Sequence, residues 1–372
     1  MSLKSQPRAK GTYIDTPLLA SILGLVIAGF LVFVSASLGL LARDTAQFGS
    51  VAMNQTISLI LGLTLFWIMS RVNYRYVRKY AFYILVGALL SNLLLFIPAL
   101  SLHHGGATRW LDFGFVTFQP SELLKIGFII YVAAWLSMIK EKVTTLGSGI
   151  IPFCILLGIL SVLLLIQSDT NTLAVVAFTG ICMLYAAGAK LRHIAIIIFI
   201  GIAGIAMVAM LRPYAQQRIM TFLNPANDPQ GAGYQIQQSL IAIGSGGMWG
   251  RGFGQSVQKF EYLPEPIGDS IFAVQAEEFG FIGSTVLVLL FVFFAVRSLK
   301  IASNTEDSFG GLFVIGLVIL IITGSFINIG AMLGLVPLTG KPLLFVSHGG
   351  SALMIILASV GIIANISKHQ KS

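Results

Sequence analysis

The residues best suited to chemistry lie in one polar stretch, residues 212–270, of an otherwise apolar chain. The stretch holds nine Gly and five Pro, which indicates irregular backbone whose N–H groups are available for binding. It ends at Asp269, directly before an apolar run. A carboxylate at the boundary between water and lipid is partly buried, which raises its pKa towards the range that suits a general base. The structural alternative is that Asp269 only caps the next helix, since aspartate is a preferred N-cap.

The charges of this stretch nearly balance, which indicates paired charges around a polar cleft rather than a patch that attracts ligands from a distance. Its cations are Arg212, Arg218, Arg251 and Lys259, and its carboxylates are Asp228, Glu261, Glu265 and Asp269. Between them, residues 234–243 predict a short amphipathic helix that is ended by glycines. A stretch of this length and composition is more than a connector between helices.

A second polar patch covers residues 119–125 and leads into an apolar run. Pro120 and Ser121 suit the start of a helix, and Glu122 then favours the positive end of its dipole. Helix capping alone explains Ser121 and Glu122 equally well. Lys125 lies one turn inside a predicted membrane span, so it must pair or extend to the interface, and it is a functional candidate.

Three more features carry polar groups. Residues 167–172 form a polar turn that could simply cap a helix. Lys341 precedes residues 349–351, Gly-Gly-Ser, which open a helix and could either offer N–H groups to an anion or merely start the helix. Glu277 and Glu278 are adjacent carboxylates within a span, and we expect them to pair with Lys or Arg and to hold the fold.

Composition predicts the fold class. With 56% hydrophobic and 10% charged residues, the chain is an all-α polytopic membrane protein. A span needs about 20 mostly apolar residues, and we predict about ten spans in one membrane domain, residues 1–372. They lie near residues 17–41, 50–70, 80–100, 121–138, 149–166, 173–189, 194–211, 271–296, 309–335 and 349–366. The large loop, residues 212–270, therefore joins the seventh and eighth spans, and residues 1–16 and 367–372 are short tails.

The Lys and Arg residues predict the orientation. If the N-terminus is cytoplasmic, 15 of the 23 Lys and Arg residues fall in inner segments, as the positive-inside rule requires. Both termini are then cytoplasmic and the large loop is extracytoplasmic. The net charge of +9 reflects this topology and attraction to anionic lipid, and no basic domain suited to nucleic acid is visible. Cys154 and Cys182 lie mid-span as small apolar residues, and the scattered histidines predict no metal site.

Several motifs resemble those of the SEDS family, and the resemblance covers nearly all ten spans in order. The motifs are residues 106–111 (GATRWL), 119–125 (QPSELLK), 224–240 (NP…DP…GYQIQQSL), 242–247 (AIGSGG), 250–256 (GRGFGQS), 262–265 (YLPE), 271–273 (IFA) and 277–283 (EEFGFIG). Within the family, the wording of residues 252–265 is more similar to the FtsW and SpoVE branches than to RodA.

The resemblance implies a peptidoglycan glycosyltransferase in the bacterial cytoplasmic membrane. Such an enzyme polymerises lipid II outside the membrane into β-1,4-linked strands, with inversion and release of undecaprenyl pyrophosphate, during septal wall synthesis. The resemblance also implies a class B penicillin-binding protein (an FtsI-like transpeptidase) and other divisome proteins as partners. No cofactor is certain, and the sequence leaves open whether a divalent cation, Mg²⁺ or Mn²⁺, assists.

Roles for single residues follow from the same resemblance. Asp269 corresponds to the family's essential aspartate and is the predicted catalytic base. The predicted pyrophosphate-binding residues are Arg109, Lys125 and Lys341, which stand in family motifs, and also Arg212, Arg218 and Lys259. The predicted supporting residues are Gln119, Glu122, Ser239, Glu265, Glu277, Glu278 and Ser347.

The chain departs from the family pattern at several positions that touch the predicted cleft, so they bear on activity or partner choice. They are Ser168, Thr170, Asn171, Ser270, His348 and residues 267–268, which replace the usual His-Thr. The alternative functions are a lipid II flippase or transporter, a RodA-like role in elongation, and a non-catalytic division scaffold. A lone carboxylate in an outer loop and the lack of visible internal repeats favour the enzyme over a transporter.

Overall fold

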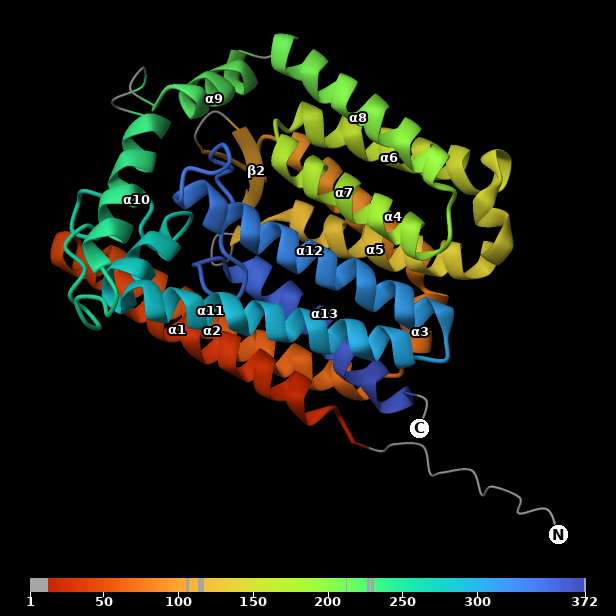
Figure 1. Cartoon of the computed structure of the whole chain (residues 1–372), viewed down its shortest axis with the longest axis horizontal. Coiled ribbons are helices and arrows are strands. Elements are labelled where there is room, and N and C mark those ends of the chain that lie inside the picture. Colours follow the sequence, from red (N-terminus) through yellow and green to blue (C-terminus); the bar gives the residue numbers. More distant parts are fainter. Residues whose placement is uncertain are drawn as a thin grey trace.

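The computed structural model describes residues 13–104, 107–112, 117–211, 213–225, 228 and 231–370. This part of the chain is a bundle of helices with a small sheet and a folded loop region at one end (Figure 1). The helices are α1 (Thr16–Arg43), α2 (Thr45–Arg71), α3 (Tyr74–Lys79), α4 (Ala81–Leu93), α5 (Pro120–Ile139), α6 (Ile151–Ile166), α7 (Thr170–Ala186), α8 (Leu191–Leu211), α9 (Pro213–Leu223), α10 (Ala232–Gly246), α11 (Ile271–Asn304), α12 (Ser308–Met332) and α13 (Gly350–Ile366).

A three-stranded antiparallel sheet and several single turns complete the described elements. They are strands β1 (Ser101–His104), β2 (Ala107–Asp112) and β3 (Thr117–Phe118), the short helices η1 (Leu94–Phe96), η2 (Lys140–Thr144) and η5 (Ser367–His369), and the π-helical turn η3 (Leu146–Ile150). The sequence did not predict this sheet. Its order is β1-β2-β3, and it lies in the connection between α4 and α5.

Each of the ten predicted apolar stretches overlaps a helix of the described chain. By length and composition, seven helical segments can cross a membrane, namely those that contain α1, α2, α5, α6, α11, α12 and α13. Three shorter apolar helices lie at residues 81–96, 170–186 and 191–204. The chain is therefore a multi-pass membrane protein, while the count of ten spans stays a prediction.

The centre of the bundle is formed by α5, α12 and α13, because the rest of the molecule covers most of their apolar surface. The apolar window of α13 is 78% buried, whereas that of α2 is only 17% buried, so α2 turns most of its apolar side chains to lipid. Even so, α2 packs closely along α13. A Cβ atom at Gly361 would lie 2.6 Å from the carbonyl oxygen of Phe66, so glycine permits this approach.

The loop region at one end of the bundle contains two helices (Figure 1). The predicted helix at residues 234–243 is confirmed within α10, which ends at Gly247 in a left-handed conformation, φ 53°. The sequence did not predict α9, which follows α8 almost without interruption. Together α9 and α10 carry the chain from α8 across the end of the bundle to α11.

The predicted span at residues 271–296 is interrupted in the structure. Gly280 has φ 64° and ψ −163° inside α11, a conformation that favours glycine. The loop after α10 bonds to the helix on both sides of this break. The N–H of Arg251 donates to the carbonyl of Glu277 at 3.0 Å, and the N–H of Phe281 donates to the carbonyl of Gly247 at 2.8 Å. The break therefore attaches the loop region to α11.

The opposite end of the bundle is held by polar contacts between distant segments. Asp15 caps α1 and accepts a 2.7 Å hydrogen bond from Nε of Arg297 on α11. The backbone N–H of Asp15 donates to Oγ of Ser367 at 3.1 Å. Arg78 and Asp307 pair at 3.3 Å. The start of α1 and the end of α13 therefore lie together at this end (Figure 1).

Candidate active site

Asp269 lies directly before α11, but it does not cap that helix. The N-cap residue is Ser270, and the start of α11 has no side-chain capping bond. The Asp269 side chain is half-buried. Its burial, and then the neighbouring carboxylate of Glu265, raise the pKa of Asp269 to about 6, against the opposing effect of Lys341, Arg218 and Arg109. The capping alternative is therefore not supported, and the carboxyl group has a pKa that suits a general base.

The side chains of Asp269 and Arg218 both lie against the connection between α12 and α13. A Cβ atom at Gly340 would lie 3.5 Å from Oδ2 of Asp269 and 3.6 Å from Nη2 of Arg218, so both side chains meet at this glycine. Gly340 has φ 62°, which favours the residue without a side chain. Arg218, on α9, also donates from Nη1 to the carbonyl of Thr339 at 3.4 Å. The large loop thus delivers both the carboxylate and a guanidinium to one place.

Lys341 joins the same cluster through a second carboxylate. Its Nζ lies 3.0 Å from Oδ2 of Asp169, which caps α7 and also accepts from Oγ1 of Thr172 at 2.7 Å. Burial on its own raises the pKa of Asp169, but Lys341 and then Arg109 bring it well below its ordinary value. Asp169 is therefore ionised and fixes Lys341 beside the cluster. The polar turn at residues 167–172 both caps a helix and binds a cation.

Arg109 reaches the cluster from β2. Its Nη2 donates to the carbonyl of Ser168, whose φ of 55° is uncommon for a residue other than glycine. The Nε of Arg109 is buried and has no hydrogen-bond partner among the described residues. A buried donor without a partner is costly, and a bound anionic oxygen would satisfy it. The structure thus brings four predicted site residues together: Asp269, Arg218, Lys341 and Arg109.

Comparison with known proteins decides the family of the chain. The model of the FtsW/RodA/SpoVE family, described as "cell cycle protein", matches residues 16–372. The chain belongs to this family. It is the family that the sequence motifs indicated under the name SEDS, so that prediction is confirmed.

Relatives within the FtsW/RodA/SpoVE family are similar along most of their length. A probable peptidoglycan glycosyltransferase FtsW from Geobacter metallireducens is 39% identical over 317 residues, which cover 85% of this chain and 84% of that protein. Stage V sporulation protein E of Bacillus subtilis is 36% identical over 320 residues, which cover 86% and 87%. The predicted likeness to the FtsW and SpoVE branches agrees with these names.

Solved structures of similar proteins have the same fold. A chain of a peptidoglycan synthase complex, studied for the coordination of polymerization and crosslinking, matches with a TM-score of 0.79 at 24% identity, over 96% of this chain and 99% of that one. The crystal structure of RodA from Thermus thermophilus matches with a TM-score of 0.68 at 24% identity, over 97% and 99%. This likeness confirms the predicted all-α membrane fold.

In the FtsW/RodA/SpoVE fold of this chain, Lys125 pairs with Glu122 on the first turns of α5. The Nζ and Oε2 atoms are 2.7 Å apart, and both side chains are almost fully buried. Nearby, the backbone N–H of Gln119 donates to Oγ of Ser351 at 3.2 Å. The pairing expected for Lys125 is confirmed. None of the described hydrogen bonds or ion pairs links this pair to Asp269, so its role towards pyrophosphate stays a prediction.

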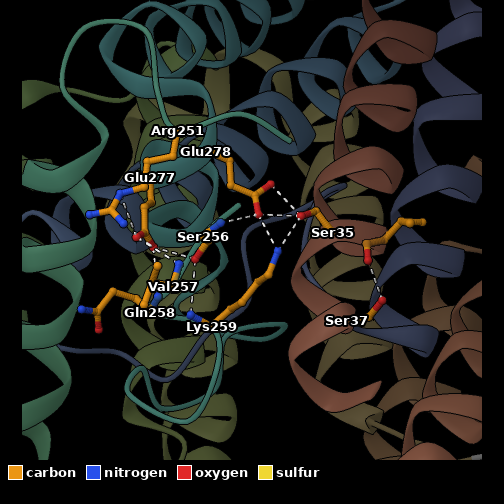
Figure 2. Close-up of polar contacts among 10 residues, drawn as sticks. Ser35, Ser37, Arg251, Ser256, Val257, Gln258, Lys259, Glu277 and Glu278 are labelled. Atoms are coloured by element: carbon orange, nitrogen blue, oxygen red, sulfur yellow. Dashed lines mark hydrogen bonds and ion pairs between the residues drawn. The ribbon is translucent and has the colours of Figure 1, made fainter. Parts of the chain in front are cut away.

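Lys259 lies in a second buried ion pair, away from the Asp269 cluster. Figure 2 shows its Nζ between Glu278 on α11 and Ser35 on α1, at 2.7 Å from Oε1 of Glu278 and 3.1 Å from Oγ of Ser35. The side chain of Lys259 is 0% exposed. A lysine enclosed in this way has its charge compensated inside the protein. The structure does not bring it to the site, contrary to the role that we predicted for it.

Glu277 holds the same loop by other means (Figure 2). Its carboxylate accepts hydrogen bonds from Oγ of Ser256 at 2.6 Å and from the N–H groups of Val257 and Gln258 at 3.1 and 3.2 Å. The Nε of Arg251 lies 3.4 Å away. The expected pairing of Glu277 and Glu278 with cations is confirmed, and their role in holding the fold stays a prediction.

The remaining predicted residues have varied places. Ser347 donates from Oγ to the carbonyl of Gly268 at 2.7 Å, so it touches the segment that carries Asp269. Ser239 donates to the carbonyl of Gln235 within α10 at 2.8 Å. Glu265 acts on Asp269 by its charge. Arg212 lies outside the described residues.

The departures from the family pattern make contacts at the site. Ser270 accepts a 2.9 Å hydrogen bond from Nε2 of Gln235. Asn171 donates from Nδ2 to the carbonyl of Thr339, in the segment that carries Lys341. His348 stacks on Phe33 and faces Oε1 of Gln55 at 3.0 Å. Each of these residues has partners that fit its own side chain.

Sequence reasoning missed Asn328. This residue lies on α12, is 1% exposed, and contacts both the Asp269 and the Lys341 segments. The available signal was its amide group inside an otherwise apolar predicted span, where polar side chains are expensive and often functional.

Proposed function

We propose that this chain is a peptidoglycan glycosyltransferase that polymerises lipid II and that Asp269 is its catalytic base. One observation carries the proposal: a half-buried carboxyl group with a pKa raised to about 6 lies among Arg218, Lys341 and Arg109. The name of the FtsW relative supports the same reaction. A base and a group of cations are the two features that transfer from a pyrophosphate-linked donor requires.

In this reaction the Asp269 carboxylate takes the proton from the attacking sugar hydroxyl. The hydroxyl oxygen then forms a bond to the anomeric carbon of the donor, while the bond from that carbon to the pyrophosphate oxygen breaks. In-line attack on an α-linked donor gives a β-1,4 linkage with inversion. Pyrophosphate leaves as an anion without needing a proton, so one carboxylate suffices, unlike in a glycosidase.

The cations stabilise the charge that develops on the leaving group. Arg109 has a buried Nε without a hydrogen-bond partner in the described part of the chain, so this donor suits a phosphate oxygen. Arg218 approaches from α9, and Lys341 is held by Asp169. We assign the pyrophosphate to these three residues. Lys259 takes no part, because its side chain is 0% exposed and lies against Glu278 and Ser35, away from the Asp269 cluster.

Other features fit the enzyme better than a transporter. The intramembrane charges that suggested a lipid path are paired internally, Lys125 with Glu122 and Lys259 with Glu278. Charges that are paired in this way are not free to bind a substrate along a path. The names FtsW and SpoVE among the relatives favour septal or sporulation synthesis over elongation.

The proposed function implies an orientation in the membrane and partner proteins. We propose that the chain lies in the bacterial cytoplasmic membrane with both termini inside and the Asp269 cluster outside, as the distribution of Lys and Arg indicates. We also propose an FtsI-like class B penicillin-binding protein and other divisome proteins as partners. The match to a chain from a peptidoglycan synthase complex supports such an assembly.

The catalytic role is tested with purified protein, its partner transpeptidase and labelled lipid II. We expect Asp269→Asn to abolish polymer, because the amide cannot accept the proton. Asp307→Asn is a matched control, since this carboxylate pairs with Arg78 at the other end of the bundle. Full polymerisation by Asp269→Asn would refute the proposal, and exchange of lipid II between leaflets without polymer would establish the transporter instead.

Metal dependence is a separate question with its own test. Among the described residues, no three His, Cys, Asp or Glu side chains form a group that could hold a metal ion. Mg²⁺ is often held mainly by substrate phosphates, with one or two carboxylates, and Asp269 with the neighbouring Glu265 offers such carboxylates. Since three cations already face the leaving group, we expect EDTA to slow polymerisation less than about tenfold. Complete loss, restored by Mg²⁺ or Mn²⁺, would assign the pyrophosphate charge to a metal ion instead.

A further inference from the structure

Asn328 connects the two halves of the proposed site. Its Nδ2 donates to the carbonyl of Asp269 at 2.8 Å and to the carbonyl of Lys341 at 2.7 Å. Two carbonyl acceptors at these distances use both hydrogens of the amide and fix which end of the side chain carries the nitrogen. One buried side chain on α12 thus holds the backbone of the base and the backbone of a cation.

The neighbouring contacts extend this attachment. The carbonyls of residues 267, 268 and 269 are all bound from the side of α12 and its connection to α13. The N–H of His348 donates to the carbonyl of Ile267 at 2.8 Å, and Oγ of Ser347 donates to the carbonyl of Gly268 at 2.7 Å. The start of α11 has no side-chain cap. These three bonds instead hold the segment that lies directly before the helix. Among the residues that make these bonds, Asn328 is the one that also donates to the carbonyl of Lys341.

We propose that Asn328 is a positioning residue, which sets the distance between the Asp269 carboxylate and the Lys341 ammonium group during transfer. The inference rests on the proposed role of Asp269. Loss of the bridge lets two separate loop segments move apart. A misplacement of about 1 Å can cost on the order of a hundredfold in rate.

The charged groups around Asp269 make this inference measurable. They are Glu265 from its own loop, Lys341 from the connection between α12 and α13, Arg218 from α9 and Arg109 from β2. Lys341 favours the ionised carboxylate, so its withdrawal raises the pKa of Asp269. The acidic limb of the pH–rate profile therefore moves to higher pH when the bridge is lost.

The decisive variant is Asn328→Leu, which keeps a similar volume and removes the donor. Asn365→Leu is the matched control, because Asn365 on α13 is also buried and also bridges two segments. Its Nδ2 donates to the carbonyl of Ser70 at 2.9 Å, and its Oδ1 accepts from the N–H of Tyr74 at 3.1 Å. Both variants lower the melting temperature, so stability alone does not discriminate between them.

The readouts are the pH–rate profile and the separation of kcat from KM, measured with labelled lipid II and the partner transpeptidase. We expect Asn328→Leu to lower kcat by about ten- to a hundredfold, with little change in KM, and to move the acidic limb to higher pH. Asn365→Leu leaves the limb in place. Asn328→Ser, which retains one donor, gives an intermediate shift and serves if the leucine variant fails to fold.

An unchanged limb and kcat in Asn328→Leu would overturn the inference, as would an equal shift in Asn365→Leu. If both Asn328 variants fold poorly while Asn365→Leu folds well, Asn328 is a folding residue and the inference is also overturned. Activity in Asp269→Asn would instead overturn the proposed function itself. The two failures are therefore distinguishable.

Discussion

Asp269 combines a raised affinity for protons with ionisation at neutral pH. Burial and the charge of Glu265 raise its pKa, so it binds a proton more readily, while the nearby Lys341 limits this rise. A base with a pKa of about 6 is ionised at pH 7 and still accepts a proton effectively. The same cations that limit the pKa face the leaving group, so one cluster serves both halves of the transfer.

This balance predicts the pH dependence of polymerisation. Because the base works in its ionised form, we expect the rate to fall as the pH drops through about 6. Glu265→Gln removes a negative charge beside Asp269, so the pKa of Asp269 falls and the acidic limb moves to lower pH. The measurement is the initial rate of lipid II polymerisation between pH 5 and 8.

Glu261→Gln is the control for this shift. Glu261 lies in the same loop and, like Glu265, has a positive φ, 71° against 48°. It is not among the four charged groups that act most strongly on the pKa of Asp269. An equal shift in both variants would mean that the overall charge of the loop, rather than the contact with Glu265, sets the pKa.

At the scale of elements, the large loop is attached to the bundle by α11. The break at Gly280 exposes backbone groups of the helix, and the loop after α10 bonds to them. Next to the break, Glu277 and Glu278 bind the loop through its N–H groups and through Lys259. These two carboxylates, which were predicted to pair with cations, thus bind the segment that leads towards Asp269.

The ion pair between Lys259 and Glu278 predicts a stability effect. Lys259→Met leaves the Glu278 carboxylate buried without its cation, which costs about 3–5 kcal/mol. The double variant Lys259→Met with Glu278→Gln removes both charges, and we expect it to recover most of the loss. Thermal unfolding in detergent measures both. If Lys259→Met were as stable as the unsubstituted protein, the ion pair between Lys259 and Glu278 would not hold the loop.

At the scale of the molecule, the features that follow from local sequence were predictable. Each apolar stretch became a helix because hydrophobicity is a local property, and α10 was recognisable from the glycines that end it. The sheet before α5, helix α9 and the break in α11 depend on distant contacts, so no local pattern indicated them.

The candidate site likewise contains residues that the sequence predicted and contacts that it did not. Asp269 was predicted from its place directly before an apolar run and from a family motif, and Arg109 and Lys341 were predicted because they stand in family motifs. The partner of Lys341 is Asp169, 172 positions away, and this pairing exists only in the folded chain. Lys259 was assigned to substrate because it lies in the polar loop, whereas its partner Glu278 belongs to a helix. Asn328 was hidden within an apolar run.

The orientation of the whole molecule gives a last prediction. Trp249, 81% exposed in the large loop, lies outside in the proposed topology, and Glu306, exposed between α11 and α12, lies inside. Single cysteines at these two positions test this arrangement in a background with Cys154→Ala and Cys182→Ala. We expect a membrane-impermeant maleimide to label Trp249→Cys in intact spheroplasts and Glu306→Cys only after permeabilisation.

The result bears directly on the reaction. Asp269 and Trp249 belong to the same loop region, which α11 separates from Glu306 by a helix of 34 residues. The part of α11 after the break at Gly280, residues 281–304, is about 36 Å long at 1.5 Å per residue, more than the roughly 30 Å of hydrocarbon. The two positions must therefore lie on opposite sides of a membrane that α11 crosses. If Glu306→Cys alone were labelled in intact cells, the Asp269 cluster would face the cytoplasm, and polymerisation of lipid II outside the membrane would be impossible there.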